Sequence, residues 1–256
     1  YGDTNSTLDG ALAAAKLHVP VAHVEAGLRS FNRRMPEEIN RVLTDHVADL
    51  LFCPSRTAVA NLAGEGISAG VHLVGDVMYE ALMHAAAIAG KKSNVLERLG
   101  VRSKGYALVT IHRAENTEEP AQLERLLSAM QDVSLHMPVL FPVHPRTRGK
   151  LRSLAAGGDL RLLQPQGYLD MVRLEAGAVA ILTDSGGIQK EAYWLHVPCV
   201  TLREETEWVE TVQQGWNVLA GTDPERIVRC ALDAVRPEEG EDAYQGAGSV
   251  DRLVRA

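Results

Sequence analysis

The sequence has few of the features that mark secreted, membrane or zinc-binding proteins. Its three cysteines, Cys53, Cys199 and Cys230, are scattered along 256 residues and form no CxxC pair. This spacing argues against a disulfide framework or a cysteine zinc site and favours a reduced chain. No apolar run reaches the roughly 20 residues of a membrane helix, and no signal peptide is visible. We therefore expect a cytoplasmic chain with no membrane partner.

Several motifs of cofactor chemistry are also missing. The stretch GEGISAG (64–70) lacks the GxGxxG spacing and follows a predicted helix. The stretch AGKKS (89–93) lacks the first glycine and the Lys-Ser/Thr order of a P-loop. Neither HExxH nor HxH occurs, so metal ligation is not expected. The net charge of −7 argues against a non-specific nucleic-acid binder. We expect no redox cofactor, no metal and no nucleic acid.

What the sequence does contain is a series of short runs rich in Val, Ile and Leu, each followed by a helical pattern. Continuous apolarity suits strands that are buried on both faces, as in a parallel sheet. The repeated strand–helix order predicts an α/β fold. The predicted strands are 21–26, 50–55, 71–76, 106–112, 138–144, 160–165, 179–184, 198–203 and 217–221.

The segment PEEINRVLTDHVADLL has the clearest helix signals. Pro36 suits the first helical position, and Glu37 and Glu38 suit the positive end of the helix dipole. An apolar stripe is expected to face the core. Its members are Ile39, Val42, Leu43, Val47 and Leu50.

A polar stretch after a long Ala-rich helix marks the predicted domain boundary. This boundary divides the chain into an N-terminal domain over 1–76 and a C-terminal domain over 77–240. The segment 241–256 is expected to end in a terminal helix. Because the chain begins with Tyr1 rather than methionine, residues are expected to be missing upstream.

The stretch TDSGGIQKEA (183–192) follows an apolar run and has the pattern of a strand, a turn and a helix start. Free backbone N–H groups and the helix dipole at Ser185, Gly186 and Gly187 would suit an anion such as a phosphate. Glu191, one turn further on, could reach a ribose hydroxyl. The alternative is an ordinary βα turn with a capping serine.

Other polar residues end predicted strands, where ligands of open α/β sheets bind. His112 and Arg113 end one strand, and His144 ends the next, so both offer cationic donors to a diphosphate. The remaining histidines, His23 among them, are expected to be surface or packing residues.

Three carboxylates are candidates for acid–base work. Asp3 lies in GDT, Glu25 ends a strand, and Glu37 opens a helix. Carboxylates in different environments can divide acid and base roles. Each also has a structural alternative, since Asp3 could cap a turn and Glu37 is an expected first-turn residue.

These residues lie in motifs that resemble those of the UDP-N-acetylglucosamine 2-epimerases, more specifically the bacterial non-hydrolysing type. The motifs are YGDTNST, HVEAGLRS, MPEEINR, GDVMYEAL, TIHRAEN, PVHPRTR and TDSGGIQKEA, in this order and through nearly the whole chain. The resemblance implies the glycosyltransferase-B architecture of two Rossmann-like domains, with 1–76 as part of the first and 77–240 as the second, UDP-binding one. It also implies that the terminal helix in 241–256 packs back on the N-terminal domain. Members begin with a strand and a turn like GTRPE, which is absent, so the N-terminal domain is expected to be incomplete.

The resemblance implies an activity, the interconversion of UDP-GlcNAc and UDP-ManNAc without a cofactor. Asp3, Glu25 and Glu37 match the acids used for acid–base work, and His112 matches the histidine that assists departure of UDP. The family's route eliminates UDP to leave 2-acetamidoglucal and then adds it back, which supplies ManNAc for surface polysaccharide. Two faces of C2 require two acid–base groups.

The resemblance also implies binding roles. Ser185 and Gly186 match the diphosphate-binding turn, Glu191 the ribose-binding acid, and Met171 a position whose backbone groups hold uracil. Arg113 and His144, with Glu37, correspond to residues that touch a second, activating UDP-GlcNAc in some bacterial members. The family implies a homodimer.

Three alternatives to this activity stay open. A hydrolysing epimerase would release free ManNAc and UDP. A glycosyltransferase of the same architecture would transfer the sugar without exchange at C2. A nucleotide-sugar-binding protein would bind UDP without turnover.

Overall fold

The computed structural model describes residues 1–143, 149, 151, 158–238, 242–244 and 246–256, and these pack as two compact units. Unit 1 comprises Tyr1–Ala81 and Glu241–Ala256, and unit 2 comprises Leu82–Gly240. Helix α4 (Met78–Lys92) begins in the first and continues in the second. The functional domains proposed over 1–76, 77–240 and 241–256 stay predictions.

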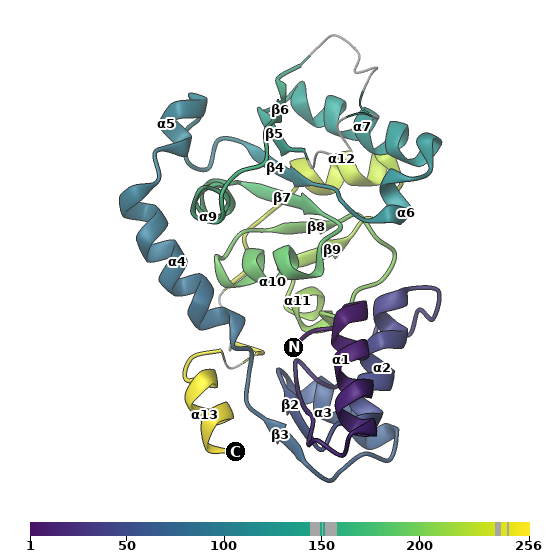
Figure 1. The fold of residues 1–256 in the computed structure, drawn as a ribbon. Helices are drawn as coiled ribbons and strands as arrows, with labels where there is room; N and C mark the ends of the chain where they lie inside the picture. The colour runs from purple at the N-terminus through teal and green to yellow at the C-terminus, as the bar shows by residue number, and fades with distance from the viewer. Residues whose placement is uncertain (144–148, 150, 152–157, 239–241, 245) are drawn as a thin grey trace. The chain divides into compact units, whose positions relative to one another are not determined.

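Unit 1 is built on a small parallel sheet. Its strands lie in the order β1 (Ala22–Val24), β2 (Leu50–Cys53) and β3 (Val71–Leu73). Chain connections between parallel strands need a crossover helix. The helices of this unit are α1 (Asn5–Lys16), α2 (Pro36–Val47), α3 (Arg56–Gly64) and α13 (Ser249–Arg255), as Figure 1 shows.

The C-terminal segment is tied to this unit by polar contacts to the end of the β3 strand. Ser249 Oγ donates to the Asp76 carbonyl at 3.1 Å, and Arg252 Nε donates to the Val74 carbonyl at 2.8 Å. The Asp76 amide in turn donates to the carbonyl of Tyr244 at 3.0 Å. The last helix therefore belongs to unit 1 although its sequence follows unit 2.

Helix α2 corrects one expectation. Pro36 does stand at its start, but the predicted apolar stripe does not face the core. Ile39 and Leu43 are 41% and 44% exposed, whereas Arg41 and Asp45 are each only 1% exposed. The helix therefore buries its charged side, and the reason lies in the partners that this side meets, described below.

Unit 2 has a six-stranded parallel sheet in the order β6-β5-β4-β7-β8-β9. The strands are β4 (Ala107–Thr110), β5 (Val139–Pro142), β6 (Leu160–Leu163), β7 (Ala180–Thr183), β8 (Cys199–Thr201) and β9 (Asn217–Leu219). The helices are α5 (Val95–Leu99), α6 (Ala114–Thr117), α7 (Pro120–Ser134), α9 (Tyr168–Gly177), α10 (Gly186–Trp194), α11 (Val209–Gln213) and α12 (Pro224–Leu232). Each predicted strand range contains one observed strand, and the α/β prediction is confirmed.

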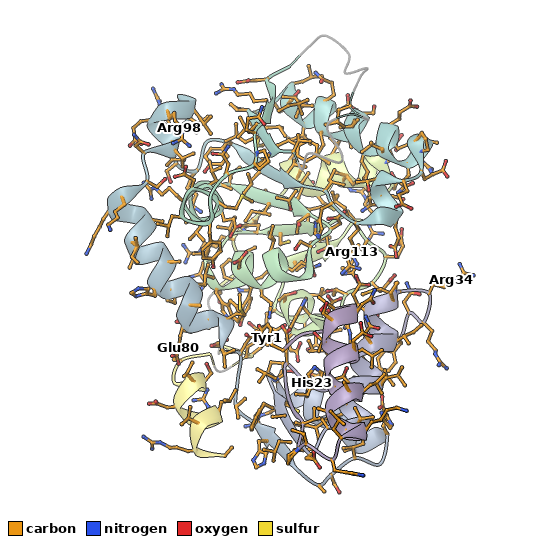
Figure 2. All side chains as sticks on the ribbon, viewed as in Figure 1. Tyr1, His23, Arg34, Glu80, Arg98 and Arg113 are labelled. Atoms are coloured by element: carbon orange, nitrogen blue, oxygen red, sulfur yellow. The ribbon has the colours of Figure 1, made fainter. Side chains whose placement is uncertain are left out.

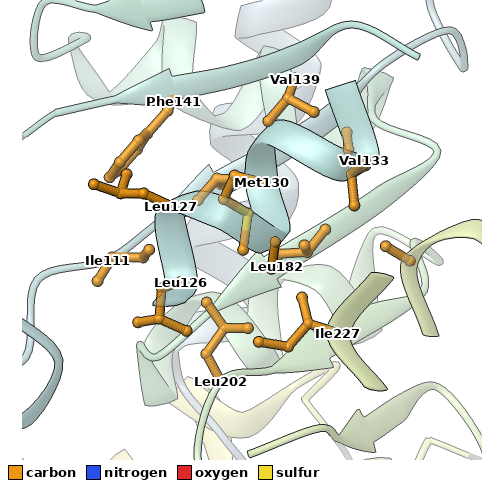
Figure 3. Close-up of a cluster of buried hydrophobic side chains, with 14 of the residues drawn as sticks. Ile111, Leu126, Leu127, Met130, Val133, Val139, Phe141, Leu182, Leu202 and Ile227 are labelled. Atoms are coloured by element: carbon orange, nitrogen blue, oxygen red, sulfur yellow. The ribbon is translucent and has the colours of Figure 1, made fainter. Parts of the chain in front are cut away.

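Both faces of this sheet are buried by helices. Val109, Phe141 and Leu182 point to a core with Leu126 and Met130 of α7, and Ile227 of α12 joins the same cluster (Figure 3). The alternate residues of the same strands point to the other side, as the two-residue period requires. There Leu108, Leu140 and Ile181 pack with Leu174 of α9 and Ala192 of α10. Continuous apolar strands thus have a direct structural reason.

The strand order creates one special position. The chain winds outward from β4 through β5 to β6, and then returns to β7 and winds the other way through β8 to β9. This is the Rossmann order, and the reversal lies between β4 and β7. Ligands of such sheets bind at the carboxyl ends of the strands at this reversal, so the residues after Thr110 and Thr183 are those to inspect.

Candidate active site

The first candidate site lies in unit 2, where β4 and β7 end side by side. The two strands pair in parallel with Thr110 opposite Thr183, and the two hydroxyls are 2.6 Å apart. The next residues are His112 and Arg113 on one side and Asp184 on the other. Figure 2 marks Arg113 at the end of β4. His112 and Arg113, which follow β4, and the turn that follows β7 thus meet at the strand reversal.

Asp184 organises this strand end. Its side chain is fully buried and accepts from the amides of His112 and Arg113 at 3.1–3.2 Å, and from Asn116 Nδ2 at 3.0 Å. It also lies 3.1 Å from Nδ1 of the His112 ring. Burial alone would raise the pKa of Asp184, but the contacts with His112, Asn116 and the Arg113 amide outweigh it and lower the pKa.

This arrangement fixes the orientation of His112. A carboxylate beside Nδ1 favours the form of the ring in which Nδ1 carries a proton and donates it to the carboxylate. Nε2 is then the ring nitrogen that is left to contact a ligand. The His112 side chain is 52% exposed, so a ligand can reach it. The Nε2 side of the ring is therefore left to face a ligand, with Asp184 behind it, and it donates there only when both ring nitrogens carry a proton.

The turn after Asp184 starts helix α10. Ser185 caps the helix, with its Oγ accepting from the Ile188 amide, while its own amide donates to Thr183 Oγ1 at 3.0 Å. The first amides of the helix point out of its N-terminus, where an anion is favoured. The geometry fits both the predicted phosphate turn and its simpler alternative, a capped helix start.

The two glycines of this turn differ. A Cβ at Gly186 would meet the Glu207 carboxylate and lie 3.0 Å from Trp208 Nε1. A Cβ at Gly187 would have only Ser185 Oγ within 4 Å, at 3.9 Å. Packing against the 203–208 loop therefore requires glycine at 186, whereas none of the described residues approaches closely enough to require it at 187.

Glu191 stands one turn further along α10, next to a second buried acid. Tyr168 Oη donates to Glu191 at 3.2 Å. Glu175 of α9 is 1% exposed, and its pKa is well raised by burial and then by the charge of Glu191, to which it is hydrogen-bonded. The pKa of Glu191 is also raised by burial, although Tyr168 and Lys190 oppose the rise. Both pKa values are thus raised in the folded protein, which favours a proton shared between the two carboxyl groups.

Two predicted binding residues remain in this unit. Met171 lies in the first turn of α9, and its amide donates to the Gly167 carbonyl at 2.9 Å. Its amide is therefore engaged within the helix, and a uracil contact there stays a prediction. His144 lies outside the described residues.

A second candidate site lies in unit 1, where Asp3 and Glu25 come together. The Gly2 amide donates to the Val24 carbonyl at 3.2 Å, which joins the N-terminal segment to the end of β1. A Cβ on Gly2 would lie 3.6 Å from Glu25 Oε2, so this carboxylate stands beside the backbone that leads into Asp3. Two of the three predicted acids are thus neighbours.

Contacts of Arg41 link Asp3 to the first turn of α2, which carries the third predicted acid, Glu37. Its buried guanidinium lies 2.8 Å from Asp3 Oδ2 and 3.7 Å from Glu38 Oε2, and its Nε donates to the Glu37 carbonyl at 3.2 Å. Glu37 itself is partly exposed in the first turn of α2. Arg41 therefore draws Asp3 towards the turn of α2 that carries Glu37.

Several important residues were not among the sequence candidates. His23 is neither exposed nor a simple packing residue, since its ring is 1% exposed and lies 2.6 Å from Asp45 and 2.9 Å from the Gly2 carbonyl. Arg41, Asp45 and Glu175 were also overlooked. The spacing of 37, 41 and 45 on one helix face was the available signal for two of them.

Two further features of the described residues concern metal binding and membrane spanning. Within the described part of the chain, no group of three or more His, Cys, Asp or Glu side chains could hold a metal ion. In the same residues, no helix combines the length and apolar character needed to cross a bilayer.

The comparisons with known proteins cover the whole of both units. The family model for UDP-N-acetylglucosamine 2-epimerase matches residues 1–254. A UDP-N-acetylglucosamine 2-epimerase homolog of Methanococcus maripaludis is 53% identical over 235 residues, which cover 89% of this chain and 65% of that protein. The UDP-2,3-diacetamido-2,3-dideoxy-D-glucuronate 2-epimerase of Pseudomonas aeruginosa is 50% identical over 261 residues, or 99% of this chain and 72% of that protein.

Solved structures agree with these sequence relatives. The crystal structure of the Methanocaldococcus jannaschii UDP-GlcNAc 2-epimerase in complex with UDP-GlcNAc and UDP superposes with a TM-score of 0.92 at 40% identity. The match covers 99% of this chain and 73% of the Methanocaldococcus chain. This chain therefore spans about two thirds to three quarters of the length of the relatives it matches. The predicted fold class of two Rossmann-like parallel-sheet units is confirmed. The chain belongs to the UDP-N-acetylglucosamine 2-epimerase family.

Proposed function

We propose that this protein interconverts UDP-GlcNAc and UDP-ManNAc by inverting C2 of the sugar, as an isomerase. The observation that carries the proposal is the strand reversal of unit 2. There an oriented histidine, His112, and the start of helix α10 meet at the place where Rossmann sheets bind nucleotides. Membership of the family supports the same activity.

Unit 2 would bind the nucleotide and assist its departure. The open amides at the start of α10 suit the diphosphate, and Glu191 suits a ribose hydroxyl. As the C1–O bond breaks, its electrons leave on the β-phosphate oxygen of UDP. Donors from His112 and Arg113 would stabilise that developing charge.

The acids of unit 1 would handle the C2 proton. C2 of the sugar is not next to a carbonyl, so its proton becomes removable only as UDP leaves. One carboxylate takes the proton, C1 and C2 form a double bond, and 2-acetamidoglucal results. UDP oxygen then adds to C1 while a second acid protonates C2 from the other face. Asp3, Glu25 and Glu37 supply enough groups for the two faces, which one carboxylate could not.

A second substrate deserves a direct test because of one comparison. The Pseudomonas aeruginosa relative is named for UDP-2,3-diacetamido-2,3-dideoxy-D-glucuronate and is 50% identical over 261 residues. The UDP-N-acetylglucosamine 2-epimerase of Methanococcus maripaludis is 45% identical over 264. The chemistry at C2 is the same for both, so the second candidate function is epimerisation of the diacetamido glucuronate.

The deciding experiment is proton NMR of the protein with each UDP-sugar in D₂O. Deuterium at C2, together with the matching C2 epimer still attached to UDP, is the expected result. The faster-exchanging sugar is the substrate. Free ManNAc and UDP would instead identify a hydrolysing epimerase. UDP binding with no exchange for either sugar would contradict epimerisation and favour a transferase or a binding protein.

The partners beyond the substrate are part of the proposal. A second UDP-GlcNAc would act as activator through Arg113, Glu37 and His144, and would appear as a sigmoidal dependence of rate on UDP-GlcNAc. A homodimer is supported by the apolar side of α2, where Ile39 and Leu43 are exposed. A cytoplasmic location stays a prediction.

A further inference from the structure

The charged side of α2 is buried, and the proposed chemistry uses only its first turn. Glu37, Arg41 and Asp45 follow at intervals of four residues and therefore lie on one face of the helix. Asp45 is the innermost of the three, with a fully buried side chain. A buried carboxylate is costly unless several donors satisfy it, so its partners show what it holds in place.

Those partners stand on both sides of Glu25. Asp45 Oδ1 lies 2.6 Å from His23 Nδ1, and Asp45 Oδ2 accepts from the Gly27 amide at 3.1 Å. His23 and Gly27 are each two residues from Glu25. Glu25 itself has a φ of +77°, a conformation that a residue with a side chain adopts only when its surroundings enforce it. Asp45 fixes the chain before and after this residue.

The same histidine also reaches the second acid. His23 Nε2 lies 2.9 Å from the carbonyl of Gly2, the residue that precedes Asp3. Both ring nitrogens face oxygen acceptors, so the ring makes both hydrogen bonds only when both nitrogens carry a proton. Figure 2 labels His23 within unit 1. One imidazole therefore joins the backbone beside Asp3 to the carboxylate that holds the Glu25 turn.

The charges around Asp45 favour this arrangement. Arg29 Nη1 donates to Asp45 Oδ2 at 2.7 Å, and Arg29 Nε and Nη2 donate to Glu65 at 2.6 and 2.9 Å. The side chains of Arg29 and His23 are each 1% exposed. Arg29 thus places a buried cation beside Asp45, and its other two donors reach the partly exposed Glu65, so the charge of Asp45 is balanced where it is buried.

We propose that His23 and Asp45 are positioning residues, which hold Asp3 and Glu25 in the mutual geometry that transfer of the C2 proton requires. The inference rests on the proposed epimerase function and adds residues to it. Neither residue would touch the sugar. Their role is to fix the backbone next to the two carboxylates, because an error of about 1 Å in a reacting group costs about 10²-fold in rate.

The main variant is His23→Phe, which fills similar space and removes both ring contacts. It leaves Asp45 bonded to Arg29 and Gly27, and the Gly2 carbonyl is partly exposed. Turnover and C2 deuterium exchange should fall about 10²-fold, whereas KM and the Kd for UDP stay within about threefold. Asp45→Asn should show the same split with a larger loss of turnover.

A matched control removes packing from unit 1 and changes none of the side chains that bond to Asp45 or His23. Leu62→Ala opens the core under α3, where Leu62 is fully buried. It should lower the thermal midpoint at least as much as His23→Phe while retaining turnover within about threefold. A His23→Phe variant with near-parental turnover would overturn the inference. Equal losses of turnover in His23→Phe and Leu62→Ala would overturn it too.

A second readout keeps this inference separate from the proposed activity. If the parent protein exchanges no C2 hydrogen, the epimerase proposal fails, and amide hydrogen exchange decides on the positioning role. His23→Phe should then speed exchange in peptides spanning 1–9 and 22–30, with unit 2 unchanged. Parental exchange in both peptides would show that His23 does not hold these segments.

Discussion

The two units hold their candidate residues by different means. In unit 2, one buried carboxylate, Asp184, accepts from the backbone amides of His112 and Arg113, which lie next to it at a strand end. In unit 1, the acids are held by buried charged side chains of one helix, through contacts between residues 16 to 38 positions apart. Unit 2 therefore uses backbone amides of a neighbouring parallel strand, whereas unit 1 uses ion pairs between buried side chains.

This difference suggests a division of labour. Backbone amides at a strand end and a helix start are rigid and suit a nucleotide, whose shape does not change during the reaction. Side-chain carboxylates near buried cations suit proton transfer, because their charge can be tuned by partners. The expected results below test whether nucleotide binding and proton transfer do separate in this way.

The largest expected effect is on turnover in Glu25→Gln. The amide cannot take a proton from C2, so turnover should fall by about 10² to 10⁴-fold. UDP affinity should be unchanged, because the contacts proposed for the nucleotide of the substrate are all in unit 2. The measurements are C2 deuterium incorporation by NMR and UDP binding by calorimetry.

An exposed acid of the same unit is the control for that variant. Asp9 lies on α1 with an exposed side chain, and Asp9→Asn should keep both turnover and UDP affinity. A parallel loss of UDP affinity in Glu25→Gln would break the division of labour, since it would mean that unit 1 also binds nucleotide.

The same difference between the two units explains how well the sequence predicted each candidate site. The turn at Ser185 could be predicted because every part of it is local, from the strand before to the helix after. His112 was found in the same way, as a polar residue that ends an apolar run. In unit 2 the strand positions also followed from continuous apolarity, since both faces of the sheet are buried.

The unit 1 network could not be predicted by the same rules. The hydrophobic pattern of α2 placed Ile39 and Leu43 inside, whereas the structure buries Arg41 and Asp45. Hydrophobicity fails here because each buried charge meets an opposite charge from a distant segment, which outweighs its desolvation. His23 was dismissed for the same reason, as its partners Asp45 and Gly2 lie about 20 residues away on either side.

The next largest effect is expected on stability, and it distinguishes a packing role of Gly186 from a ligand-binding role of Gly187 in the turn before α10. Gly186→Ala should lower the free energy of unfolding by about 1–3 kcal/mol, because its methyl group would meet Glu207 and Trp208. Gly187→Ala has room, and alanine favours the helix by up to about 1 kcal/mol. Chemical denaturation measures both.

Ligand binding then tests the phosphate role of this turn. If the diphosphate approaches the backbone at Gly187, Gly187→Ala should bind UDP more weakly although it is at least as stable as the parent. Unchanged UDP affinity in this variant would favour the simpler reading of Gly187 as part of a capped helix start.

A smaller effect on stability is expected from the pair of carboxyl groups formed by Glu175 and Glu191. Burial and the charge of Glu191 raise the pKa of Glu175 in the folded protein. Such a group contributes stability that is complete below its unfolded pKa, about 4.3, and is lost as pH rises towards its folded pKa. Within that window the loss is about 1.4 kcal/mol per pH unit. Glu175→Gln cannot ionise and keeps an amide donor, so it should gain stability over the parent as pH rises above about 4.3.

Denaturation of both proteins between pH 4 and 8 measures this difference. Parallel stability curves would mean that Glu175 ionises normally in the folded protein. Glu175 and Glu191 would then both be charged rather than share one proton. Glu175 could not donate a hydrogen bond to Glu191, so another donor would have to hold Glu191 beside the ribose.

The smallest effect is expected on the outer side of α2. Leu43 is 44% exposed, so Leu43→Gln should change the free energy of unfolding by no more than about 0.5 kcal/mol. The sequence-based stripe would instead bury Leu43 and make the same change cost several times more. Denaturation at low protein concentration distinguishes these results. If the variant also lowers the dimer fraction in sedimentation, the exposed apolar side of α2 contributes to self-association, and the helix uses its charged side for chemistry and its apolar side for assembly.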